Sequence, residues 1–111
     1  MKFLRDLYVS EDLITQAAQI TEDLKNGKYG TANHYLLTCD LHKNGQLEVL
    51  PLQLIRQGAL RERLPLIIGI ASSKDAGIEM ISAIITGILS ETGSLDYGSY
   101  FRNKPTVSSR G

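Results

Sequence analysis

The polar residues best placed to do chemistry are Ser72, Ser73 and Lys74, which follow the apolar run 64–71. This run predicts a buried strand, and the residues from Lys74 onward predict a helix, so the serines would lie at a helix N-terminus. Free backbone N–H groups and the positive end of the helix dipole favour an anion there. The sequence therefore offers an anionic-ligand site at Ser72, Ser73 and Lys74, to which Arg56, Arg61 and Arg63 could add positive charge. The alternative is that a serine only caps the helix.

The other candidates for catalysis or metal binding are Cys39, His34, Asp40 and His42. Asp40 and His42 are two residues apart on a predicted strand, where a carboxylate could orient an imidazole. A structural zinc site needs three or four ligands, and Cys39 would point to the opposite face of the strand. We therefore predict no catalytic residues, no metal site and no cofactor, and we expect Cys39 to be buried with a raised pKa.

Three aromatic residues near the C-terminus, Tyr97, Tyr100 and Phe101, precede the basic residues Arg102 and Lys104. Aromatic rings beside positive charge can stack on single-stranded nucleic acid, and the alternative is an edge strand whose aromatic rings face the core. The chain carries 12 basic and 12 acidic side chains, which gives a formal net charge of zero. Because nucleic-acid affinity comes mainly from Lys and Arg on phosphates, we expect no nucleic-acid partner.

The clearest local pattern is a β-hairpin of residues 34–42 and 46–55 around Asn44-Gly45, a dipeptide that favours a type I′ turn. A two-residue turn places Cys39 opposite Leu50. In this register six side chains share the core face: Tyr35, Leu37, Cys39, Leu50, Leu52 and Leu54. Pro51 lacks an N–H and therefore predicts an edge, a bulge or a break on the far side of its strand.

Two helices are predicted, over residues 11–26 and 74–91, and the second has one narrow polar stripe: Glu79, Ser82, Thr86 and Ser90. A helix with so thin a polar face is mostly buried and can touch two surfaces. Residues 1–9 fit either a helix or a strand, and residues 95–101 predict a last strand parallel to 64–71. The preferred strand order is 34–42, 46–55, 64–71, 96–101.

Length and composition place limits on the class of protein. A chain of 111 residues is expected to form one domain. The single cysteine excludes an intrachain disulfide and favours a reducing compartment. The N-terminal residues do not resemble a secretory signal, and the most apolar region is far shorter than the ~20 apolar residues of a membrane span. We therefore expect a cytoplasmic protein with no membrane partner, and its zero net charge favours self-association.

Short motifs in the chain are similar to those of a group of small uncharacterised bacterial proteins: Leu7-Tyr8-Val9-Ser10-Glu11, Gly69-Ile70-Ala71, Thr92-Gly93 and Tyr100-Phe101. This resemblance implies one intact bacterial cytoplasmic domain and supplies no activity. Ser73-Lys74 also resembles the start of the second helix of double-stranded-RNA-binding domains. Asp75 and Ile78 stand where that family has basic residues, which argues against RNA binding here.

The sequence as a whole predicts a single α+β domain over residues 1–101 and a polar, disordered tail over 102–111. The expected architecture is a two-layer sandwich, in which a mostly antiparallel sheet of three or four strands packs against two helices. The expected function is a non-catalytic module that self-associates, as a homodimer or larger homo-oligomer, or binds a protein partner. The alternative function is a binder of, or an enzyme acting on, a small anionic ligand at Ser72–Asp75.

Overall fold

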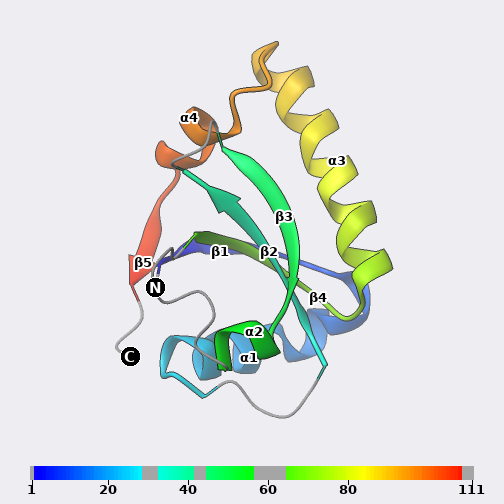
Figure 1. The fold of residues 1–111 in the computed structure, drawn as a ribbon, viewed down its shortest axis with the longest axis vertical. Helices are drawn as coiled ribbons and strands as arrows, with labels where there is room; N and C mark the ends of the chain where they lie inside the picture. Colours follow the sequence, from blue (N-terminus) through cyan, green and yellow to red (C-terminus); the bar gives the residue numbers. More distant parts are fainter. Residues whose placement is uncertain (1, 29–32, 42–44, 57–64, 109–111) are drawn as a thin grey trace.

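A computed structural model describes residues 2–28, 33–41, 45–56 and 65–108 of the chain (Figure 1). In sequence order its elements are β1 (Lys2–Val9), the 3-10 helix η1 (Glu11–Gln16), α1 (Ala17–Lys25), β2 (Tyr35–Asp40), β3 (Gln46–Pro51), α2 (Gln53–Arg56), β4 (Leu66–Ala71), α3 (Lys74–Thr92), α4 (Tyr97–Arg102) and β5 (Thr106–Ser108). This confirms the predicted α+β class. Residues 1–9, which the sequence left open between helix and strand, contribute β1.

The sheet has five strands in the order β3-β2-β4-β1-β5, more than the three or four predicted. β2 is antiparallel to both β3 and β4, whereas β1 is parallel to β4, so the sheet is mixed. The preferred strand order was wrong, because β2 lies between β3 and β4 and leaves β3 at an edge. Pro51 belongs to this edge strand, where a missing N–H costs no ladder hydrogen bond.

Successive residues of the strands point into two apolar clusters on opposite faces of the sheet. Leu4 and Leu37 belong to the cluster beneath α3, together with Ile84 and Ile88 of that helix. The neighbouring residues Phe3 and Leu36 belong to a second cluster, with Leu13 of η1 and Leu24 of α1. Figure 1 shows α3 on one side of the sheet and α1 on the other. The predicted common core face of the hairpin is therefore divided, because Leu37 and Cys39 belong to the cluster beneath α3 and Leu52 belongs to the second cluster.

All six residues of β4 are buried, as the continuous apolar run predicted. Its pairing with β2 skips one residue, because Leu37 lies opposite Gly69 and Thr38 lies opposite Ile67. The skipped residue, Ile68, is a β-bulge, and a bulge resets the alternation of side chains along a strand. Ile68 and Ala71 therefore both reach the cluster beneath α3.

The hairpin exists, but its predicted register was wrong by three residues. Cys39 lies opposite Leu47 instead of Leu50, and the last pair is Asp40 with Gln46. A longer connection replaces the two-residue turn, and Asn44 lies outside the described residues. The predicted second strand also ends early, because α2 begins at Gln53.

Contacts with α4 explain the longer connection of the hairpin. The Arg102 guanidinium donates a hydrogen bond of 2.7 Å to the Leu41 carbonyl oxygen. Gly45 has φ +77° and packs backbone to backbone against Gly98, where no side chain would fit. The two described ends of the connection, Leu41 and Gly45, therefore both contact a segment distant in sequence.

The predicted C-terminal strand over 95–101 was also wrong, because this region contains α4. Asp96 caps the helix: its carboxylate accepts hydrogen bonds from the Ser99 backbone N–H at 3.1 Å and from the Ser99 hydroxyl at 2.7 Å. The expected disordered tail needs a correction as well, because Thr106–Ser108 form β5 and pair with β1. Residues 109–111 lie outside the described residues.

The two long predicted helices have close counterparts. Residues 11–26 form η1 followed by α1, and Gly27 has φ +75° just beyond the helix. α3 ends at Gly93, whose φ of +70° supplies the left-handed C-cap. In the part of the chain that the structure describes, no helix is long and apolar enough to cross a membrane.

Candidate functional site

The predicted anion site lies at the N-terminus of α3, where β4 ends. Ser73 is the N-cap of the helix, and its hydroxyl oxygen accepts a hydrogen bond of 3.1 Å from the Ala76 N–H. The capping role that the sequence offered as the alternative is therefore confirmed for Ser73. Lys74 is exposed at the first position of the helix, while Arg61 and Arg63 lie outside the described residues.

The third predicted residue, Ser72, contacts a turn of the chain far from it in sequence. Its backbone N–H donates a hydrogen bond of 3.1 Å to the Ser10 hydroxyl oxygen. Hydrogen bonds from the Ser72 and Ser10 side chains also hold the pKa of Asp12 below its ordinary value. The chain's own carboxylate thus takes up polar groups that an anionic ligand would need. Binding of an external anion at Ser72–Lys74 stays a prediction.

Of the other sequence candidates, the structure describes Cys39, His34 and Asp40. Cys39 is fully buried, and burial raises the pKa of its thiol to about 11, so the thiol is protonated at neutral pH. His34 precedes β2, and His42 lies outside the described residues. Among the described residues, no group of three or more His, Cys, Asp or Glu side chains could hold a metal ion.

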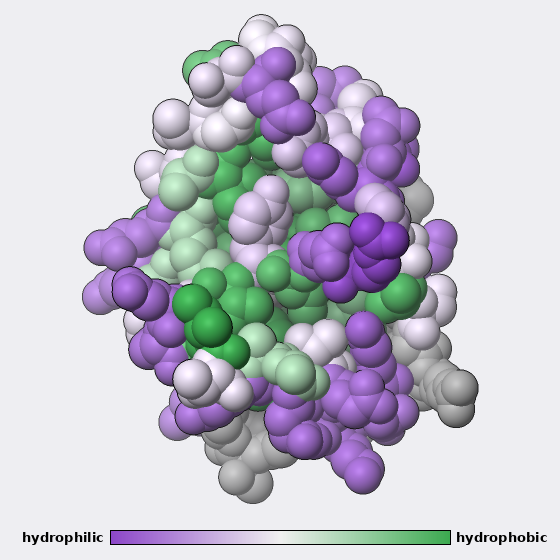
Figure 2. Space-filling model, turned by 180° about the vertical axis from the view of Figure 1, so that it is seen from behind, coloured by the Kyte–Doolittle hydropathy of each residue, from purple (hydrophilic) through white to green (hydrophobic). Residues whose placement is uncertain are grey.

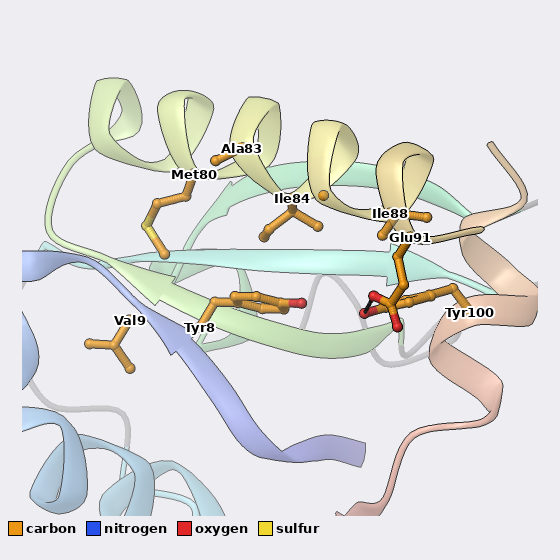
Figure 3. Close-up of a pocket in the computed structure, with 9 residues that line it drawn as sticks. Tyr8, Val9, Met80, Ala83, Ile84, Ile88, Glu91 and Tyr100 are labelled. Carbon is orange, nitrogen blue, oxygen red and sulfur yellow. Dashed lines mark hydrogen bonds between the residues drawn. The ribbon is translucent and has the colours of Figure 1, made fainter. Parts of the chain in front are cut away.

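A groove of about 400 Å³ lies between β1 and α3. Its apolar walls consist of Val9, Met80, Ala83, Ile84 and Ile88, with the ring of Tyr8 along the floor (Figure 3). On the face seen from behind in Figure 2, apolar side chains gather in a central hollow with hydrophilic side chains around it. The volume and the mostly apolar lining match those of small-molecule sites.

One end of the groove carries three polar groups from three separate elements. The Tyr100 hydroxyl of α4 donates a hydrogen bond of 3.1 Å to Oε2 of Glu91, near the end of α3 (Figure 3). The Tyr8 hydroxyl of β1 points toward this pair. Burial, the neighbouring Tyr100 hydroxyl and the charge of Glu91 raise the pKa of Tyr8, so its hydroxyl stays protonated.

A more polar pocket adjoins this end and shares Glu91 and Tyr100 with the groove. Asp96 and Lys104 lie on its wall. The Lys104 ammonium lies 4.6 Å from the centroid of the Tyr100 ring, within the range of a cation–π contact. The three aromatic residues therefore belong to a helix instead of an edge strand: Phe101 faces the core, as that alternative expected, and Tyr100 lines the groove.

The opposite flank of α3 carries an apolar row, consisting of Ile78, Ile81, Ile85 and Leu89, which we call the α3 stripe. Helical geometry separates the α3 stripe from the groove, because the buried line of Gly77, Ile84 and Ile88 runs between them. Ile78 is 51% exposed and Leu89 is 46% exposed, while Ile81 and Ile85 are partly buried. α3 also packs on β3, with Gly77 directly over Val49.

Sequence reasoning missed the polar end of the groove. Tyr8, Glu91 and Tyr100 are far apart in the chain, and no local spacing relates them. The useful signal was the pair of small residues Ala83 and Gly87, which interrupts an otherwise bulky apolar helix on one flank.

Comparisons with known proteins add no family to this description. No family model matches the chain, no curated protein matches it, and no solved structure matches it.

Proposed function

We propose that this protein is a non-catalytic module that assembles with a second copy of itself through the α3 stripe. The observation that carries the proposal is the exposure of Ile78 and Leu89 at the two ends of one apolar row. Large apolar side chains aligned along a helix favour burial against a partner, whereas isolated ones need no explanation.

The spacing of the α3 stripe suits an antiparallel pair of α3 helices about a two-fold axis. Such an axis near the middle of the helix sets Ile78 opposite Leu89 of the second copy. The same axis sets Ile81 opposite Ile85 of that copy, so the row is complementary to itself. Self-complementary contacts of this kind define the isologous interface of a two-fold dimer.

Charge also favours the antiparallel arrangement. Lys74 stands at the N-terminal end of α3, and the last turn of α3 contains no basic residue. In the antiparallel pair Lys74 approaches the C-terminal end of the partner helix, where free carbonyl groups carry partial negative charge. Each helix then supplies the cation that the other lacks.

Four side chains bury only part of the ~800 Å² per partner that a standard interface requires. The adjacent edge strand β3 supplies further apolar area through Leu47 and Val49, which are half-buried. Glu48 and Pro51 oppose direct strand pairing at this edge, since charge and a missing N–H are common protections of edge strands. The interface we propose therefore consists of helix and side-chain contacts.

The alternative function, an anionic-ligand site at Ser72–Asp75, receives less support. The Ser73 hydroxyl acts in the cap, and Ser72 hydrogen-bonds to Asp12. A bound anion would have to displace the Asp12 carboxylate or tolerate its repulsion.

Size-exclusion chromatography with light scattering tests self-association. We expect a dimer for the natural chain and a monomer for Leu89→Asp, with unchanged circular dichroism because the side chain is half exposed. Leu95→Asp is the matched control, since Leu95 is 56% exposed and lies outside the α3 stripe. A natural chain that remains monomeric at its highest soluble concentration would rule out the proposal. Equal dissociation by both variants would place the interface elsewhere.

A further inference from the structure

We propose that the groove between β1 and α3 binds a small amphipathic molecule that has an elongated apolar body and an ammonium head. The body would lie along Met80, Ala83 and Ile84, and the head would meet Glu91 between the rings of Tyr8 and Tyr100. This site lies on the opposite flank of α3 from the α3 stripe, so it does not depend on self-association.

The small size of Gly87 favours a groove that is kept free of side chains over one that results from poor packing. A glycine inside a helix costs roughly 0.5–1 kcal/mol relative to alanine. Close packing does not require glycine here, because a Cβ built at position 87 meets nothing within 4 Å. Gly77 of the same helix differs, since a Cβ there would come within 2.7 Å of Val49. At position 87 the missing side chain leaves room in the groove instead of admitting a neighbour.

The hydrogen bonds at the polar end select the head group. Tyr100 donates to the Glu91 carboxylate, and Tyr8 in turn interacts with the Tyr100 hydroxyl. The protons of the hydroxyl groups point along this chain toward the carboxylate, which leaves oxygen lone pairs available as acceptors. A ligand head that donates hydrogen bonds therefore fits better than one that only accepts them.

Charge narrows the head group to a cation. Glu91 forms no ion pair with a described residue. Across the groove and the adjoining polar pocket, the carboxylates of Glu91 and Asp96 outnumber the single ammonium of Lys104. Lys104 already lies 4.6 Å from the Tyr100 ring centroid, so an ammonium finds a favourable ring in this region. The carboxylates of Glu91 and Asp96 would repel a carboxylate head.

Isothermal titration with octylamine, 1-octanol and octanoate tests the site, because the three probes share a chain length and differ in the head. We expect octylamine to bind about fivefold more tightly than octanol, the gain of one solvent-facing ion pair. Octanoate should bind most weakly. Glu91→Gln should remove the preference for the amine and leave octanol binding unchanged.

A substitution that fills the groove provides a second, independent test of the binding site. Gly87→Leu should abolish binding of octylamine and octanol, whereas Thr86→Leu, which places the same leucine side chain on the exposed side of α3, should not. Absence of binding by both octylamine and octanol overturns the site. Octanoate binding as tight as octylamine overturns the choice of head group. A change of oligomeric state in Gly87→Leu, with no effect on probe binding, would make the groove a protein interface instead.

Discussion

The two flanks of α3 have similar apolar residues and different surroundings. On one flank β1 and α4 approach the helix and enclose a groove whose end carries Tyr8, Glu91 and Tyr100. On the other flank the α3 stripe leaves Ile78 and Leu89 about half exposed. Apolar periodicity predicts that a helix flank will be covered, but it does not identify what covers it.

The residue sizes on the two flanks differ in a way that fits their surroundings. The groove flank contains Ala83 and Gly87, whose small size leaves space between the helix and β1, whereas the α3 stripe contains only Ile and Leu. Small side chains make room for a bound molecule, and large ones supply area to a surface that associates. The same helix can therefore serve two different kinds of partner.

The strongest test of this comparison is to truncate isoleucines in the buried line and in the α3 stripe. Ile88 is 2% exposed, so Ile88→Ala should lower the free energy of unfolding by about 2–5 kcal/mol. Ile78 is 51% exposed, so Ile78→Ala should change it by less than about 0.5 kcal/mol. Urea denaturation at low protein concentration, where self-association is weak, measures both. Equal losses would mean that the α3 stripe is packed within one chain.

A pair of glycine substitutions compares the packed side of α3 with the groove side. Gly77→Ala should destabilise the protein by about 1–2 kcal/mol, because the new Cβ would approach Val49 Cγ1 within 2.7 Å. Gly87→Ala should stabilise it by roughly 0.5–1 kcal/mol, because its Cβ meets nothing within 4 Å and alanine favours the helix.

Thermal and urea denaturation of the two variants show whether each substitution raises or lowers the free energy of unfolding. Val49→Ala should relieve much of the loss in Gly77→Ala, because the two sites are in contact and their effects should not add. Destabilisation by Gly87→Ala would show that the groove is closed in solution, which contradicts its proposed role.

Elements with strong local signals could be predicted from the sequence. β4 is buried throughout and α3 begins at the Ser73 cap, each for the reason that the residues indicated. In these segments hydrophobic pattern and capping residues favour the same structure, so no distant contact has to override them.

The errors arose where a distant contact decides the structure. Asn44-Gly45 favours a two-residue turn, but α4 packs against Gly45 and binds Leu41, which lengthens the connection and shifts the register. β1 pairs in parallel with β4, although the two strands are far apart in the sequence, and no local sequence pattern predicts such a pairing. α4 is a different case, because Asp96 three residues before Ser99 is an N-cap signal that sequence analysis could have used.

The sequence predicted the helix that carries the candidate site, but not the groove along it. The sequence placed a ligand site at one end of α3, where the residues cap the helix and bind Asp12. The groove lies along the side of the same helix, and its polar end requires β1, α3 and α4 to meet.

The smallest expected difference between the two flanks is their response to alkaline pH. The groove flank contains Tyr8, whose pKa is raised by burial and by its neighbours, whereas the α3 stripe contains no titratable group. The folded state therefore holds the Tyr8 proton more tightly than the unfolded chain does. This contribution is fully present below the unfolded pKa of about 10 and is lost as pH rises through the raised folded pKa.

Tyr8→Phe should consequently flatten the alkaline fall in unfolding free energy, and its cost at pH near 8 should be at most about 1 kcal/mol. Ile85→Ala on the α3 stripe should leave the slope with pH unchanged, and Cys39, which also titrates in this range, is present in both variants. Phenolate absorbance during an alkaline titration gives a second reading, because one of the five tyrosines should ionise late in the natural chain and be missing in Tyr8→Phe. A Tyr8 that titrates normally would mean that the floor of the groove is open to water at its polar end.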